Sequence, residues 1–317
     1  MAAISNTFTT QTAIGIREEL ADIIYNISPE ETPFISNIKK GKVNNTLYEW
    51  QTDDLAAVDL ANAAPEGGDI TTFTAVTPTV RMQNYAQIST KEVIISDTQE
   101  VVNKAGRNSE IAYQIAKKGK ELRRDMEAIC LSNQGAVSTA TRKTGSMLAI
   151  IKTNVNKAAS GVNPVYTTLP DDPRTDHTQR AFTEVILKDV IQQCWVQGAN
   201  PKMIMVGPKN KQALSAFAGI AAQRYQAPTS GQTRIVAGAD IYQSDFGELA
   251  VVANRFQRDR DAFVLDPEYA SIVHLRPFKQ RPLAKTGDAE KRQLVVEWGL
   301  KVPQEKAHGL AADLTTP

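Results

Sequence analysis

The longest amphipathic segment of the chain lies between residues 109 and 132. Apolar side chains recur there at intervals of three, four and seven residues, which places them on one face of a helix: Ile111, Ile115, Leu122, Met126 and Ile129. Lys and Arg side chains occupy mainly the other face, and Asn108 or Ser109 can cap the start. A helix over 109–132 would be about 36 Å long, so we predict that it spans one face of a domain.

The N-terminal segment shows a shorter apolar repeat. The first residues, 1–11, lack periodicity, and a helical spacing then follows at Ile16, Leu20, Ile23, Ile24 and Ile27. Ser28 with Glu31 three residues later resembles a capping box, so we predict a second short helical turn that Pro33 ends. This arm contains too few apolar residues to fold alone and must pack on something else.

The second half of the chain combines two helices with many short strands. One helix begins near Thr183 and ends at Gly198, and Gly207-Pro208 opens another after an apolar strand at 202–206. Further strand-like runs follow at 241–243, 249–252, 263–265, 272–275 and 293–302. Because the strands cluster instead of alternating with helices, we predict an α+β fold.

A pair of strand-like segments precedes the long helix. Residues 43–52 and 80–88 alternate polar and apolar positions, and 53–70 between them form an Ala/Gly/Pro-rich tip. Neither segment has the apolar density of a central strand, and an isolated two-stranded ribbon is only marginally stable. The ribbon therefore lies either on its own domain or, as we favour, on another copy of the chain.

Charge distinguishes this ribbon from the rest of the molecule. The 317 residues carry a net charge of +1, but 43–80 contain six acidic residues and no Lys or Arg, so the remainder carries +7. An acidic ribbon and a basic body attract one another between copies. The small net charge argues against a dedicated nucleic-acid binder. No apolar run approaches the length of a membrane span, and residues 1–11 lack the features of a signal peptide.

Short motifs that could indicate catalysis or a cofactor are weak. The three histidines, His177, His274 and His308, have no ligand-spaced partners, so we predict no metal site. Cys130 and Cys194 lie among apolar residues and are expected to be reduced core residues. Ser36 with Lys39, together with a K-T-G at Lys285, matches two of three serine β-lactamase motifs, but the third is absent. We predict neither a catalytic residue nor a cofactor.

The candidate functional residues are therefore contact residues on the ribbon. Trp50 and Tyr85 are amphipathic aromatics of the kind enriched at interfaces, and we favour them as anchors; packing within the same hairpin is the alternative. Arg81 could pair with a neighbour's carboxylate or remain solvated. The acidic residues Asp53, Asp54 and Glu66 of the tip complete the set.

Several short segments, in a joint order, resemble the major capsid proteins of tailed bacteriophages, which have the Hong Kong 97-like fold. The resemblance runs nearly from end to end. The segments that carry it are Ser28-Pro29-Glu30-Glu31-Thr32-Pro33-Phe34, Arg81…Asn84…Gln87-Ile88, Glu110…Gln114…Ala116…Glu121-Leu122-Arg123-Arg124-Asp125…Glu127, Tyr242-Gln243-Ser244-Asp245-Phe246-Gly247, Leu275-Arg276-Pro277-Phe278 and Leu283-Ala284-Lys285-Thr286-Gly287-Asp288.

The resemblance implies a division of the chain and a role for each part. It assigns an N-terminal arm, an extended loop (E-loop) that lies over a neighbouring subunit, a peripheral domain backed by a spine helix at 109–132, and an axial domain at the capsomer centre. The implied ranges are 1–38 for the arm, 39–96 for the E-loop, 97–181 for the peripheral domain, 182–270 for the axial domain and 271–317 for strands that return to the peripheral domain.

The resemblance also implies partners and a location. The expected assembly is an icosahedral head of pentamers and hexamers in the virion, built in the host bacterial cytoplasm around double-stranded DNA that it contacts non-specifically. A scaffolding protein would be a separate chain, because the arm begins almost at Met1. A portal and, as an open option, a decoration protein are further partners. An encapsulin-like compartment shell is the alternative with the same fold, and a serine hydrolase is a remote one.

Overall fold

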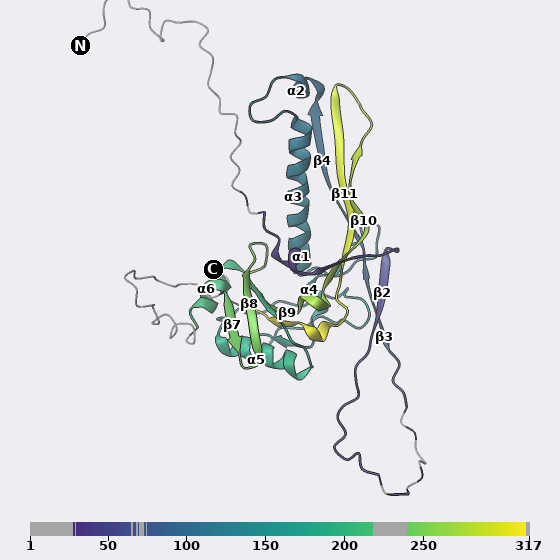
Figure 1. The fold of residues 1–317 in the computed structure, drawn as a ribbon, viewed down its shortest axis with the longest axis vertical. Coiled ribbons are helices and arrows are strands. Elements are labelled where there is room, and N and C mark those ends of the chain that lie inside the picture. Colours follow the sequence, from purple (N-terminus) through teal and green to yellow (C-terminus); the bar gives the residue numbers. More distant parts are fainter. Residues whose placement is uncertain are drawn as a thin grey trace, which may run out of the picture.

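The computed structural model describes residues 28, 30–64, 66, 67, 69, 73, 75–217 and 240–314. A long helix stands beside three long strands, a body of shorter strands and helices lies below them, and a hairpin with a wide loop projects from the body (Figure 1). The helix predicted at 16–27 lies outside the described residues. No helix within the described ranges is long and apolar enough to cross a membrane.

The long strands belong to a four-stranded sheet. Its strands, in order across the sheet, are β1 (Lys39–Lys42), β10 (Ser271–Pro282), β11 (Ala289–Lys301) and β4 (Gln87–Ser96). β1 is parallel to β10, and the other pairs are antiparallel. The ends of the 39–96 segment therefore lie in this sheet, and only its middle part projects.

The predicted long helix is confirmed as α3 (Glu110–Leu131), which packs against β4 and β11 and follows the short helix α2 (Asp97–Val101). Ser109 caps it, since its hydroxyl oxygen accepts a hydrogen bond of 3.2 Å from the backbone N–H of Ala112. The C-terminal half of its apolar face, which includes Leu122 and Met126, is buried. The cap and the apolar stripe together account for the position and orientation of the helix.

The body is built on a six-stranded mixed sheet. Its strands, in order, are β5 (Val155–Asn156), β12 (Gly309–Ala311), β9 (Ala262–Leu265), β6 (Met203–Val206), β8 (Gly247–Ala253) and β7 (Ile241–Ser244). β6, which the sequence predicts as a buried strand, has all four residues buried. The last strand of the chain, β12, joins this sheet, so the range 271–317 is shared between the two sheets.

Two helices accompany this sheet. α5 (Glu184–Val196) follows its predicted start at Thr183, and Gly198 ends it with a φ of +84°, a conformation that glycine adopts without strain. α6 (Pro208–Ser215) begins with the predicted proline in its first turn. The mixture of segregated sheets and helices confirms the α+β class.

The segment before β1 differs from the sequence prediction. Residues 30–32 are not helical, and the short helix α1 (Pro33–Asn37) begins at the proline that was expected to end a turn. A proline at the first helical position lacks only an N–H that would have no partner there, so Pro33 opens the helix. Phe34 and Ile35 of α1 are buried.

Residues 134–181, which the sequence shows as poorly patterned, form a folded linker. The helix α4 (Met147–Ile150) is buried at every position, and isolated bridges pair Val162 with Thr175 and Val165 with Asp172. Two short 3₁₀ helices, η1 (Pro267–Tyr269) and η2 (Glu305–Ala307), complete the described elements.

Candidate assembly surface

The projecting ribbon consists of β2 (Leu47–Thr52) and β3 (Val80–Tyr85), and its base is fixed to the body. The rings of Tyr48 and Trp50 stack with their centroids 6.1 Å apart, and the Tyr48 hydroxyl donates a 2.8 Å hydrogen bond to the carbonyl of Leu300. Burial raises the pKa of Tyr48 above its usual value, so this hydroxyl stays protonated as a donor. Lys301 Nζ lies 5.8 Å from the centroid of the Trp50 ring.

Asn84 on β3 strengthens this attachment. Its side-chain Nδ2 donates to the carbonyls of Gly145 and Leu300, at 3.2 and 2.8 Å, and its Oδ1 accepts a 2.9 Å hydrogen bond from the N–H of Gly145. The side chain is fully buried, and each of these bonds joins the ribbon to a distant part of the chain. The base of the ribbon is therefore held rigidly, and its direction is set by the body. In a strand that contains many polar residues, the sequence alone does not show which Asn is buried and which polar side chains are solvated.

The structure distributes the predicted aromatic and basic contact residues along the two strands of the ribbon. Trp50 is only 8% exposed and faces the body of its own chain, which is the local packing role that the sequence leaves open. Tyr85 is half-buried, opposite Leu47. Arg81 forms an ion pair with Glu49 across the two strands of the same ribbon. Arg81 thus has a carboxylate partner within its own chain.

The acidic candidates occupy different environments. Asp54 Oδ2 lies 2.7 Å from Lys306 Nζ, and its Oδ1 accepts a 3.2 Å hydrogen bond from Gln304, so Asp54 ties the start of the loop to the body. Asp53 and Glu66 are exposed. The acidic set is therefore divided between one residue anchored to the body and two exposed ones.

Beyond Asp54 the loop exposes apolar side chains that the sequence analysis did not single out. They are almost fully exposed: Leu55 (99%), Val58 (87%), Leu60 (97%), Phe73 (83%) and Val76 (93%). They have no helical or strand periodicity, which is why pattern reading passes over them. The signal that could identify them is their occurrence in an Ala-rich loop that contains no Lys or Arg. Large exposed apolar surface is typical of interaction sites, and this makes the loop the candidate surface.

A buried carboxylate fixes the arm to the spine helix. Glu127 of α3 accepts hydrogen bonds from the backbone N–H groups of Phe34 and Ile35, at 2.7 and 2.9 Å, and a 2.6 Å bond from Asn254 Nδ2. Burial raises the pKa of Glu127, and the three donors oppose that shift. One side chain thus joins α1, α3 and the segment that follows β8.

The body packs its apolar side chains into buried clusters within the chain, whereas five large apolar side chains of the loop are almost fully exposed. Residues 3–315, which include every residue that the structure describes, match the SU10 major capsid protein family. The chain belongs to this family. As a major capsid protein of the tailed-phage type it is a structural protein and not an enzyme.

Similar proteins agree with this assignment. The chain is 29% identical over 339 aligned positions to the "Major capsid protein" of Escherichia phage Phieco32, an alignment that covers 93% of this chain and 94% of that protein. Its fold matches a chain of the Cyanophage A-1(L) capsid asymmetric unit with a TM-score of 0.69 at 11% identity, covering 97% of this chain and 99% of that one. The fold of the capsid protein is therefore the expected Hong Kong 97-like α+β fold.

The same fold also occurs in a protein compartment. The SrpI encapsulin of Synechococcus elongatus matches with a TM-score of 0.55 at 9% identity, covering 96% of this chain and 93% of that one. Identity at this level shows the fold alone. The choice between a phage capsid protein and an encapsulin-like shell protein therefore rests on the family match, which favours the phage capsid.

The residues that the sequence raised as possible catalytic or metal-binding groups lie at separate places in the capsid protein. Ser36 is exposed on α1, and Lys285 Nζ lies 2.9 Å from Asp97 Oδ2. His308 is fully buried, and Cys130 and Cys194 are buried free thiols. Among the described residues, no group of three His, Cys, Asp or Glu side chains is arranged to hold a metal ion.

Proposed function

We propose that this capsid protein forms pentamers and hexamers that close into an icosahedral shell around double-stranded DNA. The family match supports the shell, and the observation that carries the mode of assembly is the loop at 53–79. It projects from the body in Figure 1, and its apolar side chains are 83–99% exposed. Heterologous contacts between identical chains close into rings when the rotation allows it.

The proposed domain roles are those that the resemblance to phage capsid proteins implies. The loop of the 39–96 segment covers a neighbouring subunit, the spine helix at 109–132 backs the peripheral four-stranded sheet, and the axial part at 182–270 meets its copies at the capsomer centre. The rigid base of the ribbon supports this proposal, because Asn84 and Tyr48 fix the direction in which the loop projects. A fixed direction lowers the entropy that must be lost when the loop binds.

The six candidate contact residues divide into two proposed groups. Asp53 and Glu66 are free to meet a neighbour directly. Trp50 and Asp54 attach the ribbon to the body, Arg81 pairs within the ribbon, and Tyr85 is half-buried on it. We propose that the exposed parts of these four side chains contribute only to the periphery of the contact. Exposed ion pairs such as Arg81–Glu49 contribute little to stability, so substitution of Arg81 should affect the rate of association more than the durability of the shell.

Further partners and the location also belong to this proposal. The capsid protein is assembled in the host bacterial cytoplasm and resides in the virion. A separate scaffolding protein, a portal and, optionally, a decoration protein would complete the head. The packaged DNA would be contacted non-specifically, through phosphate groups and basic side chains.

Particle formation by the purified full chain tests the proposal. Sizing chromatography and negative-stain microscopy should show capsomers or closed shells of megadalton size. A monomer that stays monomeric at all protein concentrations, with or without scaffolding protein, contradicts the proposal. DNA in particles isolated from infected cells distinguishes a phage head from an encapsulin-like compartment, which would contain protein cargo instead.

A further inference from the structure

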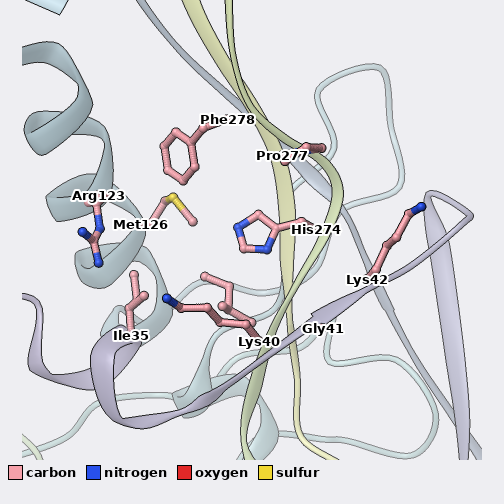
Figure 2. Close-up of a pocket in the computed structure, with 10 residues that line it drawn as sticks. Ile35, Lys40, Gly41, Lys42, Arg123, Met126, His274, Pro277 and Phe278 are labelled. Carbon is pink, nitrogen blue, oxygen red and sulfur yellow. The ribbon is translucent and has the colours of Figure 1, made fainter. Parts of the chain in front are cut away.

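A cavity of about 720 Å³ opens beside the spine helix, between α1, β1, α3 and β10. Figure 2 shows side chains from all four elements converging on one space, with Met126 and Phe278 on one side and Ile35 and Lys40 on the other. Its volume lies within the range of about 300–1,000 Å³ that is common for binding sites. The cavity is open to solvent, and Phe278 at its edge is 41% exposed.

The chemistry of the cavity is an apolar interior with a basic rim. Ile35, Met126 and Ile272 supply the buried apolar part of the lining. Lys40, Lys42 and Arg123 supply the rim, and within the described ranges no carboxylate forms an ion pair with any of them. Burial and the nearby Lys40 lower the pKa of His274, so this ring is neutral and adds no charge at pH 7. The cavity therefore suits an apolar segment that carries negative charge.

The chain itself contains a segment with this chemistry. Residues 55–60 read Leu-Ala-Ala-Val-Asp-Leu, and the side chains of Leu55, Val58 and Leu60 are 87–99% exposed. Asp59 lies between two of these apolar side chains, and the whole 53–79 loop has five acidic and no basic residues. Full burial of one Leu or Val side chain contributes about 1.5–3 kcal/mol, so two of them in the cavity would make a substantial contact.

The loop and the cavity of one chain point in different directions. Asp54 is held by Lys306, and in Figure 1 the loop projects away from α1 and α3, beside which the cavity opens. Contact between the two features is therefore a contact between two copies. This arrangement is heterologous, and repetition of it around an axis closes a ring.

We propose that residues 55–60 of one capsid protein bind in the cavity between α1, β1, α3 and β10 of a second copy. Apolar side chains of the segment fill the Ile35–Met126–Phe278 space, and Asp59 lies against Lys40. This inference rests on the proposed function and names the receiving surface for the loop. The apolar contacts stabilise the docked state, and the opposite charges guide the approach and select the register.

Thiol-specific crosslinking in assembled particles tests the contact. We would combine Val58→Cys with Phe278→Cys in the full chain, whose native Cys130 and Cys194 are buried, and treat particles with a short bis-maleimide. The proposal predicts a ladder of crosslinked dimers and higher oligomers. Matched controls are Phe278→Cys alone and Val58→Cys with Val185→Cys, since Val185 is 75% exposed on α5 of the axial part. Both controls should yield less than a tenth of the ladder.

Each other outcome overturns the inference. Particles without a 58–278 ladder leave the proposed function intact and refute the cavity as the receiving surface. A 58–278 crosslink within one chain shows that the loop binds its own body. A crosslink between Leu20→Cys and Phe278→Cys that equals or exceeds the 58–278 ladder shows that the N-terminal segment fills the cavity. Failure of the parent chain to form particles refutes both proposals.

A charge exchange gives an independent readout of the same contact. Lys40 and Lys42 are exposed on strand β1. We therefore expect the Lys40→Glu/Lys42→Glu variant to fold with an unchanged melting curve. We expect the yield of particles to fall at least tenfold, and addition of Asp59→Lys to restore at least a third of the parent yield. Equal particle yields for the parent and the Lys40→Glu/Lys42→Glu variant, or no recovery on adding Asp59→Lys, would contradict the pairing.

Discussion

The body and the loop at 53–79 differ in which side chains they bury: the body buries charged side chains, and the loop exposes apolar ones. Arg174, Asp261 and Asp313 are fully buried in side chain, and the guanidinium of Arg174 lies 3.2 Å from Asp261 Oδ1 and 3.0 Å from Asp313 Oδ2. In the loop, Leu55 and Leu60 are apolar and almost fully exposed. The body buries charge because partners are present within the chain, whereas the loop leaves large apolar side chains exposed in the isolated chain.

This difference teaches where the free energy of each region comes from. Removing one member of a buried ion cluster leaves a charge without compensation, so the body is sensitive to single substitutions. Exposed apolar side chains contribute nothing to folding of the isolated chain, and their burial at about 25 cal/mol per Å² is gained only on assembly. If the loop is the assembly surface proposed above, stability and assembly depend on separate regions, and substitutions should separate them.

Deletion of residues 53–70 is expected to have the largest effect. The ribbon base is held by Asn84 and Tyr48, outside the deletion, so the body should melt within about 2 °C of the parent, as a change of about 0.5 kcal/mol implies for a domain of this size. Particle formation should be lost. Differential scanning calorimetry and negative-stain microscopy of the same preparation check both statements.

A matched variant guards this test against an effect of chain length. Replacement of 53–70 by a Gly/Ser segment of equal length keeps the ribbon closed but removes Leu55, Val58, Leu60 and the five acidic side chains of the loop. It should fail to assemble in the same way. If either variant forms particles as well as the parent does, the loop has no role as an inter-subunit clamp.

Substitution Arg174→Leu addresses the body. It leaves Asp261 and Asp313 buried with only the partly exposed Arg258 and Arg260 nearby, and we expect a loss of about 4 kcal/mol in the free energy of unfolding. Urea unfolding of the unassembled chain measures the loss. The control Lys202→Met removes an exposed ion pair with Glu268 and should cost less than about 1 kcal/mol. Equal losses for the two variants would contradict the contrast between buried and exposed charge.

Sequence patterns predicted elements whose determinants are local. The helix at 109–132 follows from its apolar stripe and the Ser109 cap, and α5 follows from Thr183 and Gly198. The resemblance to phage capsid proteins supplied the fold, which the family and structural matches confirm. These elements are encoded within about twenty consecutive residues, so reading the sequence is sufficient for them.

The parts that escaped prediction depend on contacts between distant residues. Pro33 was expected to end a turn, yet it opens α1, because Glu127 receives the N–H groups of Phe34 and Ile35 more than 90 positions away. The cluster of Arg174 with Asp261 and Asp313 joins three distant segments. In the sequence these residues look like ordinary solvated charges, and only the fold brings them together.

Substitution Glu127→Gln tests the junction of arm and spine helix. The amide keeps one acceptor but directs an NH₂ group at an N–H donor, so at least one buried N–H loses its partner, and we expect a loss of about 2–3 kcal/mol. Urea unfolding and the rate of proteolysis near residue 30 measure it. Glu121→Gln on the same helix, where Lys118 Nζ lies 2.7 Å away, is the control and should cost about 0.5 kcal/mol. A loss at Glu127 no larger than at Glu121 would contradict the role of the junction.

The smallest expected effect is a pH dependence inside the body. Burial lowers the pKa of His308 from 6.5 to about 4, and its neutral ring accepts a hydrogen bond from the N–H of Asp266 at Nδ1 and lies 3.3 Å from the carbonyl of Tyr269 at Nε2. Between these pKa values the unfolded chain binds a proton that the folded chain does not. The contribution of His308 is therefore complete above pH 6.5 and is lost as the pH falls toward 4, by about 2 kcal/mol at pH 5.

Asp261 acts with the opposite sign. Burial raises its pKa from 3.8 to about 6, so the folded chain binds the extra proton, and stability from this group increases as the pH falls from 6 toward 3.8. The two groups largely cancel in the parent, and a variant is needed to separate them. The substitution His308→Gln lowers the free energy of unfolding relative to the parent. We expect this loss to be about 2 kcal/mol smaller at pH 5 than at pH 7, as measured by urea unfolding. A constant cost for His308→Gln across this pH range would show that its ring is not held neutral by burial.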